Sequence, residues 1–218
     1  PLPEVLRNRD FTLYWSGVVL SQIGTRGTVA ANLYHVYALT DSIAWTGLVG
    51  AGQAVALILL SPLGGALADR YDRRRLLQWA QAVSLVVAVA LTAVTFAGVV
   101  EAWHVVLSVL FTTAAATFDQ PARQALIPAI VGKKHIGEAI ALLNPSREVA
   151  VLAGPLLAGV LIAVAGPGLM YAVDAVTYAA LIVVLVFVRV PRLEPKGAAA
   201  GSIFGSIAEG ARYVVRRP

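Results

Sequence analysis

The sequence predicts an all-α membrane protein with six transmembrane helices, and two observations lead to this fold class. Apolar residues make up 58% of the 218 residues and charged residues only 13%, whereas a soluble domain has about 25% charged residues. The apolar residues also gather into long runs of the roughly 20 residues that a helix needs to cross a bilayer. A large soluble helical core is the alternative, but its helices are rarely apolar on all sides over such lengths.

The first predicted helix covers residues 11–40 and contains a single charge, Arg26. The other five predicted spans are residues 42–68, 76–100, 102–118, 137–165 and 169–188. Turn and breaker residues separate them. The fourth connection, FDQPARQALIPAIVGKKH, contains Pro121 and Pro128, so the fourth helix has room to extend past Phe118 before it ends.

Lys and Arg residues occupy every second connection between the predicted helices. They are Arg7 and Arg9, then Arg70, Arg73, Arg74 and Arg75, then Arg123, Lys133 and Lys134, and finally Arg189, Arg192 and Lys196. The intervening connections contain Asp41 and Glu101 but no Lys or Arg. By the positive-inside rule, both ends of this segment are expected in the cytoplasm. Since the charges form no continuous face, they do not predict nucleic-acid binding.

The chain divides into residues 1–189, the predicted six-helix bundle, and residues 190–218, a predicted cytoplasmic linker. The linker begins with VPRLEPKGAAAG, which is rich in Pro, Gly and Ala. Apolar residues then recur at helical spacing from Ile203 to Val215. This pattern is typical of a short amphipathic helix on the membrane surface, and a soluble linker helix is the alternative.

The segment GGALADRYDRRRLL, from Gly64 to Leu77, resembles the signature loop of the major facilitator superfamily (MFS), G-x-L-[AS]-D-[RK]-x-G-[RK]-[RK]. The matching residues are Gly65, Leu67, Ala68, Asp69, Arg70, Arg73 and Arg74. Asp72 stands where the general pattern has glycine. The form ADRYDRR and the stretch FDQPARQALIPAIVG are similar to the branch of bacterial multidrug, macrolide and siderophore exporters.

The resemblance implies a transporter of twelve helices in two halves, located in the bacterial cytoplasmic (inner) membrane. This chain would then be one half of the MFS fold, the N-terminal six-helix half with its linker, and the C-terminal six-helix half would be absent. Internal inverted repeats are expected in such a half.

Asp69 lies at the end of the second predicted helix, where a carboxylate is costly unless it is paired. Arg73 is four residues away, so a pair within one helix is one prediction; the arginines could alternatively anchor the hairpin to lipid phosphates. The resemblance implies a charge network that gates the transporter together with the missing half, and Gly65 would allow close helix approach. The predicted gating residues are Gly65, Asp69, Arg70, Arg73, Arg74, Asp119 and Arg123.

Polar residues form one stripe along the first predicted helix, flanked by Gln22 and Arg26. The stripe consists of Ser21, Thr25, Thr28, Asn32 and His35, whose spacing places them on one helical face. Such a stripe faces the bundle interior or a wet cavity, so it predicts either interhelical hydrogen bonds or a wall of the central cavity. The latter is what the resemblance implies for this helix.

Arg26 lies in mid-membrane and needs a partner, because an unpaired charge there costs at least ~2.5 kcal/mol. Depth counting favours Glu148 over Asp174 as that partner. The predicted substrate-cavity or proton-coupling residues are Gln22, Arg26, Asn32 and Glu148. Glu148 is the predicted proton carrier, and Asp174 is interpreted as structural.

The stretch AVLAGPLLAGVL in the fifth predicted helix resembles the antiporter motif G-x-x-x-G-P-x-x-G-G. Gly154, Pro155 and Gly159 match, while Ala150 and Ala158 replace glycines. The small residues at every fourth position favour tight helix packing, which is the alternative to an antiporter role.

The predicted function is proton-coupled efflux of small amphiphilic molecules, such as drugs or siderophores. The expected partners are the lipid bilayer, a small-molecule substrate, protons and the C-terminal half. An MFS importer or facilitator and a non-transporting six-helix membrane module are the alternatives. No enzyme activity, cofactor or metal is predicted, because the sequence has no phosphate-binding G-x-x-x-x-G-K-[ST] motif and no cysteine, and its three histidines lie in separate regions.

Overall fold

The computed structural model describes residues 3–70 and 72–189, without the side chains of residues 62–70. This part of the chain is helical and contains no strand. The six long helices are α1 (Arg9–Thr40), α2 (Ile43–Arg70), α3 (Arg73–Phe96), α4 (Ala102–Val131), α5 (Ile136–Ala165) and α6 (Pro167–Phe187), with short 3₁₀ helices η1 (Glu4–Arg7) and η2 (Lys133–His135). The predicted amphipathic helix after residue 202 lies outside the described residues.

Five of the long helical segments are long and apolar enough to cross a membrane, by length and composition alone. They correspond to α2 through α6, and α1 is outside this set. The helix positions agree with the six predicted spans to within a few residues at most boundaries. The ends have local causes: the Asn8 side chain accepts hydrogen bonds from the first-turn amides of α1, and Asp41 ends that helix in the left-handed conformation.

The largest difference from the prediction is the C-terminal end of α4. The fourth predicted span ends at Phe118, but α4 continues through Pro121 and Pro128 to Val131. Prolines are tolerated in membrane helices where neighbouring groups satisfy the backbone. Two carbonyls of this stretch accept hydrogen bonds from side chains of other helices, as described below. Arg123, predicted in a loop, therefore lies within the helix.

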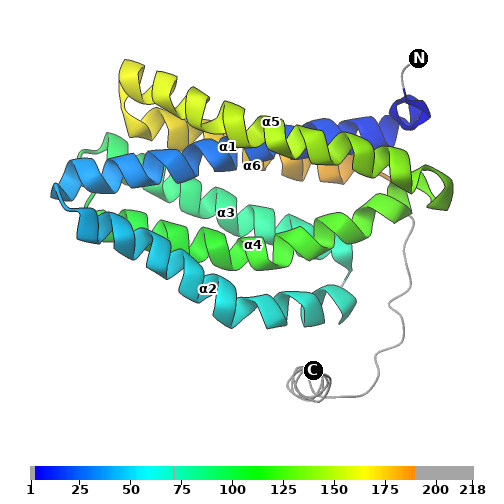
Figure 1. The fold of residues 1–218 in the computed structure, drawn as a ribbon, viewed down its shortest axis with the longest axis horizontal. Coiled ribbons are helices and arrows are strands. Elements are labelled where there is room, and N and C mark those ends of the chain that lie inside the picture. Colours follow the sequence, from blue (N-terminus) through cyan, green and yellow to red (C-terminus); the bar gives the residue numbers. More distant parts are fainter. Residues whose placement is uncertain (1–2, 71, 190–218) are drawn as a thin grey trace.

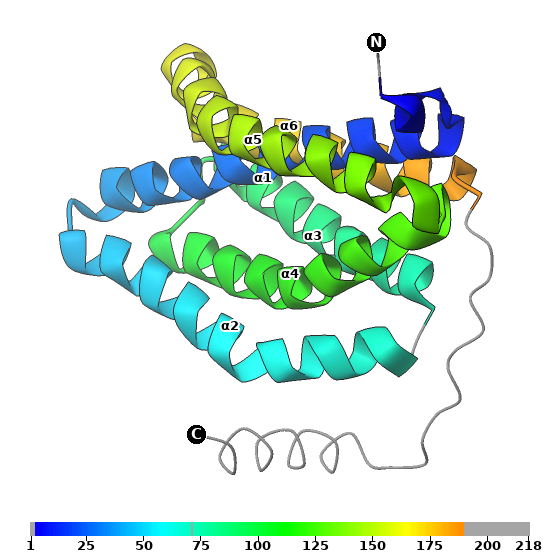
Figure 2. The same ribbon diagram turned by 45° about the vertical axis from the view of Figure 1, so that its right-hand side comes forward.

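The helices run back and forth in an open arrangement (Figure 1). α1 packs against α5 and α6, α3 packs against α6 and α4, and α2 packs against α4. Figure 2 shows α2 and α5 on opposite sides of the bundle. We call the end of the bundle at which α1, α3 and α5 begin the charged end, since it holds Arg9, Arg73 and Lys133.

The closest contact between α1 and α5 is made by Gly154. A Cβ atom on Gly154 would lie 2.5 Å from the Cβ of Arg26 and 2.7 Å from the backbone nitrogen of Gly27. Only glycine fits here, because the obstructing atoms belong to the α1 backbone and its first side-chain carbon. Gly159, in contrast, has open space where its Cβ would stand, and Pro155 is exposed.

We predict that Gly154→Ala lowers stability by about 1–3 kcal/mol, the range for overpacking a close contact. Gly137→Ala is the matched control, with the same chemical change on the same helix at a position with open space for a Cβ atom, and it should leave stability unchanged or slightly higher. Thermal unfolding of the natural full-length protein in detergent measures both. Equal stability of the two variants would contradict the packing role of Gly154.

Candidate functional site

A buried ion pair lies inside the bundle on α4. The Nε atom of Arg123 donates a hydrogen bond to Oδ2 of Asp119 at 2.5 Å, and their side chains are 12% and 11% exposed. The other ion pair among the described residues, His135–Glu138, is more exposed. Burial makes a lone charge costly, so each member of the Asp119–Arg123 pair depends on the other.

Side chains from two further helices complete the surroundings of this pair. Gln81 on α3 donates from Nε2 to Oδ1 of Asp119 at 2.6 Å. Ser21 on α1 lies 3.5 Å from both Gln81 Oε1 and Arg123 Nη2. The Tyr14 hydroxyl, also on α1, donates to the backbone carbonyl of Arg123 at 3.1 Å. The pair therefore holds α1, α3 and α4 together, and we call these five residues the ion-pair centre.

Three members of the ion-pair centre, Ser21, Gln81 and Tyr14, are absent from the predicted site residues, although Ser21 belongs to the predicted polar stripe. The sequence gives a reason to select Gln81, because an amide inside an otherwise apolar span needs a hydrogen-bond partner. It gives no such reason for Tyr14, since a tyrosine near a helix start is ordinary in a membrane protein. One guanidinium nitrogen of Arg123, Nη1, is buried without a hydrogen-bond partner among the described residues.

The signature loop does not place Asp69 and Arg73 on one helix. α2 ends at Arg70 and α3 begins at Arg73, so the predicted pair within a single helix is wrong. Asp72 explains the break, because its side chain accepts a hydrogen bond from the Arg75 amide and caps α3. Aspartate caps a helix more strongly than glycine, which gives a physical reason for Asp72 where the family pattern has glycine.

The first two arginines of α3 contact neighbouring helices. Arg73 donates from Nη1 to the Ala125 carbonyl on α4 at 3.2 Å, and Arg74 donates from Nη2 to the Val186 carbonyl on α6 at 2.9 Å. These contacts fix the start of α3 between α4 and α6. Gly65, Asp69 and Arg70 belong to the last turns of α2, where the structure describes no side chains.

The polar stripe of α1 faces α6. The Thr25 hydroxyl lies 3.1 Å from the Tyr178 hydroxyl, and Nδ1 of His35 lies 3.1 Å from the Tyr171 hydroxyl. Asn32 is only 4% exposed, and its Oδ1 has no hydrogen-bond partner among the described residues. Interhelical contact therefore accounts for Thr25 and His35 of the stripe.

We name this contact the polar seam between α1 and α6. It consists of Thr25, Thr28 and His35 on α1 and of Tyr171, Asp174, Thr177 and Tyr178 on α6. Asp174 is 1% exposed, so its carboxyl lies inside the bundle.

Arg26 and Glu148 form no ion pair in the described part of the chain, so their predicted pairing is wrong. The reason is axial position. Arg26 is level with Gly154, and Glu148 precedes Gly154 by six residues, or about 9 Å along the helix. Glu148 is exposed on α5, whereas Arg26 and Gln22 are half-buried on α1.

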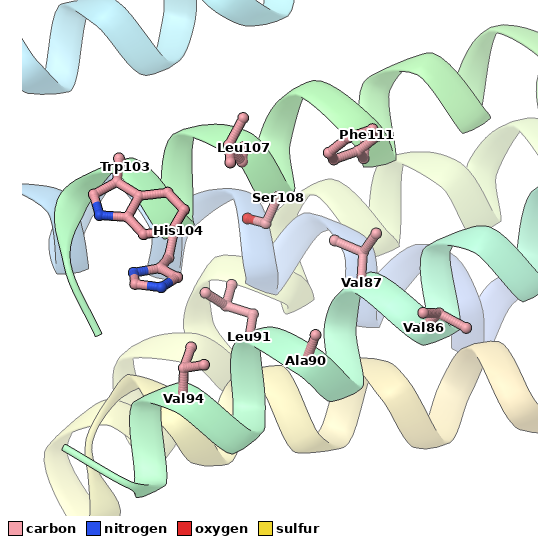
Figure 3. Close-up of a pocket in the computed structure, with 10 residues that line it drawn as sticks. All are labelled: Val86, Val87, Ala90, Leu91, Val94, Trp103, His104, Leu107, Ser108 and Phe111. Atoms are coloured by element: carbon pink, nitrogen blue, oxygen red, sulfur yellow. The ribbon is translucent and has the colours of Figure 1, made fainter. Parts of the chain in front are cut away.

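An apolar groove of about 250 Å³ lies between α3 and α4, at the end opposite the charged end (Figure 3). Val86, Ala90 and Val94 of α3 face Leu107 and Phe111 of α4 across it. These apolar side chains favour contact with hydrocarbon groups. The lining contains no member of the ion-pair centre or of the polar seam, so the groove is a separate feature.

The family of the chain follows from comparison with known proteins. Residues 4–217 match the family described as transmembrane secretion effector. The chain is a member of the major facilitator superfamily. As such it is a multi-pass membrane protein, and its relatives are transporters rather than enzymes.

Three relatives illustrate the similarity. Macrolide efflux protein A of Streptococcus pyogenes is 21% identical over 84% of this chain and 45% of its own length. The staphyloferrin A transporter of Staphylococcus aureus is 27% identical over 76% of this chain and 40% of its own length. The uncharacterized MFS-type transporter YkuC of Bacillus subtilis is 26% identical over 64% of this chain and 32% of its own length. The chain thus spans less than half the length of these relatives.

We predict that Asp119→Asn destabilises the protein by about 3–5 kcal/mol, because it leaves the Arg123 guanidinium buried without a counter-charge. Glu138→Gln is the control, since it removes the acid of the more exposed ion pair and should change stability little. Thermal unfolding of the full-length protein in detergent measures both. The double variant Asp119→Asn/Arg123→Gln should regain part of the loss; if it is less stable than Asp119→Asn, the two residues do not act as a pair.

Proposed function

We propose that the chain forms part of a secondary active transporter that exports small amphiphilic molecules in exchange for protons by alternating access. The observation that carries this proposal is the family match over residues 4–217, which includes the whole helix bundle. The names of two relatives, a macrolide efflux protein and a staphyloferrin A transporter, support small molecules as substrates. The sequence contains no phosphate-binding loop of an ATPase, which favours an ion gradient as the source of energy.

The proposed gate joins the signature loop to the ion-pair centre. Arg73 hydrogen-bonds the carbonyl of Ala125, two residues beyond Arg123 on α4. A movement of the loop would therefore be transmitted to the α4 segment that holds the buried pair. We propose that Gly65, Asp69 and Arg70, at the end of α2, complete the gate with the second half of the transporter.

The proposed cavity wall uses the polar side chains that this half leaves accessible. Gln22 and Arg26 on α1 and Glu148 on α5 are half-buried or exposed, which supports a position facing the other half. Gly159 and Pro155 lie open on α5 and offer that half a flat surface. Asn32 is the fourth proposed cavity residue; it is 4% exposed in this half, and its Oδ1 has no hydrogen-bond partner among the described residues.

Transport into inverted membrane vesicles that contain the full-length protein tests the function. A radiolabelled macrolide and staphyloferrin A are suitable probes. We expect accumulation only when the vesicle interior is acidic, and its loss when an ionophore removes the pH gradient. Loss of probe from preloaded inverted vesicles, driven by the pH gradient, would indicate an importer. No movement of any probe would contradict the transport proposal.

We further predict that Asp69→Asn abolishes this transport while membrane insertion stays normal, because the gate loses a charge at its boundary position. Asp72→Asn is a matched control three residues away. Asparagine caps helices as well as aspartate, so this variant should transport normally. Full activity of Asp69→Asn at an equal amount of inserted protein would overturn the gating role.

A further inference from the structure

Asp174 is a carboxyl group that neither the gate nor the cavity wall uses. It lies on α6 and is 1% exposed. The α1 backbone presses against it, since a Cβ atom on Gly24 would stand 2.7 Å from Oδ1 of Asp174. Among the described residues no Lys, Arg or His forms an ion pair with it. A carboxylate enclosed in this way lacks the counter-charge that the interior of a membrane protein requires.

The groups that face Asp174 are uncharged. Thr28 on α1 and Thr177 and Tyr178 on α6 place hydroxyl groups beside the carboxyl. On the side of α3, Ala88 packs against Ala175 and Tyr178. The Cβ of Arg26 lies against Gly154 of α5, and Arg26 forms no ion pair with Asp174. Asp119 and Arg123 on α4 pair with each other.

The hydrogen bonds around Asp174 indicate whether its protonated or its ionised carboxyl group fits these surroundings. The Thr177 hydroxyl donates to the backbone carbonyl of Asp174 at 2.8 Å and, more weakly, to its Oδ1 at 3.3 Å, so the carboxyl receives only a shared hydrogen from it. The Thr28 oxygen is buried and has no partner of hydrogen-bond geometry among the described residues. A carboxylate needs donors, whereas a carboxylic acid brings its own donor and needs an acceptor. To a carboxylate the site offers the hydrogen of Thr28 and a shared hydrogen of Thr177 but, among the described residues, no cation, whereas both hydroxyl oxygens can accept from an acid. These surroundings favour the acid.

We propose that Asp174 is a proton-binding site of this half of the transporter. It holds a proton while α1 and α6 are closed on each other, as in this structure, and gives the proton to water when the two helices separate. The binding of a proton follows from the polar seam alone, while its use in transport rests on the proposed function.

Polar contacts along α1 run from Tyr178, close to this site, toward the ion-pair centre. Tyr178 follows Asp174 by one helical turn, and its hydroxyl lies 3.1 Å from that of Thr25. Thr25 donates to the Ser21 carbonyl at 2.9 Å, and the Ser21 hydroxyl reaches Arg123. A negative charge formed at Asp174 would compete with Asp119 for Arg123 through these groups. Proton release at the seam is thereby linked to the α4 segment that contacts the signature loop.

Infrared spectroscopy of the full-length protein in lipid vesicles tests the proton directly. We expect the carbonyl band of a protonated carboxyl at neutral pH, lost in Asp174→Asn and retained in Glu148→Gln, the matched amide substitution on α5. Should Asp174→Asn fail to fold, Thr28→Val provides the second variant; it keeps the acid, removes an acceptor and should shift the band. An absent band in the wild type, or a band that neither Asp174→Asn nor Thr28→Val alters, would overturn the proposal.

Transport measurements then test the linkage. With a macrolide as probe, Asp174→Asn should reduce accumulation driven by the pH gradient at least tenfold, while exchange of labelled for unlabelled macrolide continues. Gradient-driven accumulation at the wild-type level in Asp174→Asn would overturn the link between the proton and transport. If the wild type itself shows no dependence on the pH gradient, the proposed function fails, and the infrared result still decides whether Asp174 binds a proton.

Discussion

The hydrocarbon around a membrane protein offers no hydrogen bonds, so a polar group buried in the bundle has to find its partner within the protein. This constraint determines which helices become neighbours. Asp119 and Arg123 satisfy each other and draw in Gln81 of α3 and Ser21 of α1. Thr25 and His35 of the α1 stripe meet hydroxyl groups on α6. Polar contacts thus fix the order of the inner helices, and glycine at the α1–α5 contact fixes how closely the outer one approaches.

The positions of the helices were predictable because length and apolar composition are enough to identify a membrane span. It has to be about 20 residues long and apolar, and five of the six predicted spans end within a few residues of the structural ones. α4 is the exception, for a specific reason. Pro121 and Pro128 leave the Thr117 and Gln124 carbonyls without their amide donors. Yet α4 continues, and donors from α1 and α3 hold the neighbouring Arg123 and Ala125 carbonyls in place. Those donors come from distant parts of the chain, and a local reading of the sequence does not contain them.

The neighbours of the polar residues were less predictable than their positions. The spacing of Ser21, Thr25 and His35 correctly gives one helical face, but spacing alone leaves open which helix meets that face. Depth counting placed Arg26 near Glu148, and a difference of two helical turns was enough to separate them. Tyr171 and Tyr178 gave no signal in the sequence, because tyrosine is common in membrane helices and becomes informative only once α6 is known to face α1.

The acids of this half differ in their surroundings, and this difference has a consequence for their roles. Asp119 is buried with a cation, Asp174 is buried without one, and Glu148 is exposed. When a further part of a transporter packs on the bundle, exposed residues such as Glu148 acquire new neighbours, whereas the buried ones keep theirs. The electrostatics of Asp119 and Asp174 are therefore already set by this half. A proton taken up at Asp174 would act on α1, α6 and, through Tyr178, on the ion-pair centre before it acted on any surface shared with the other half.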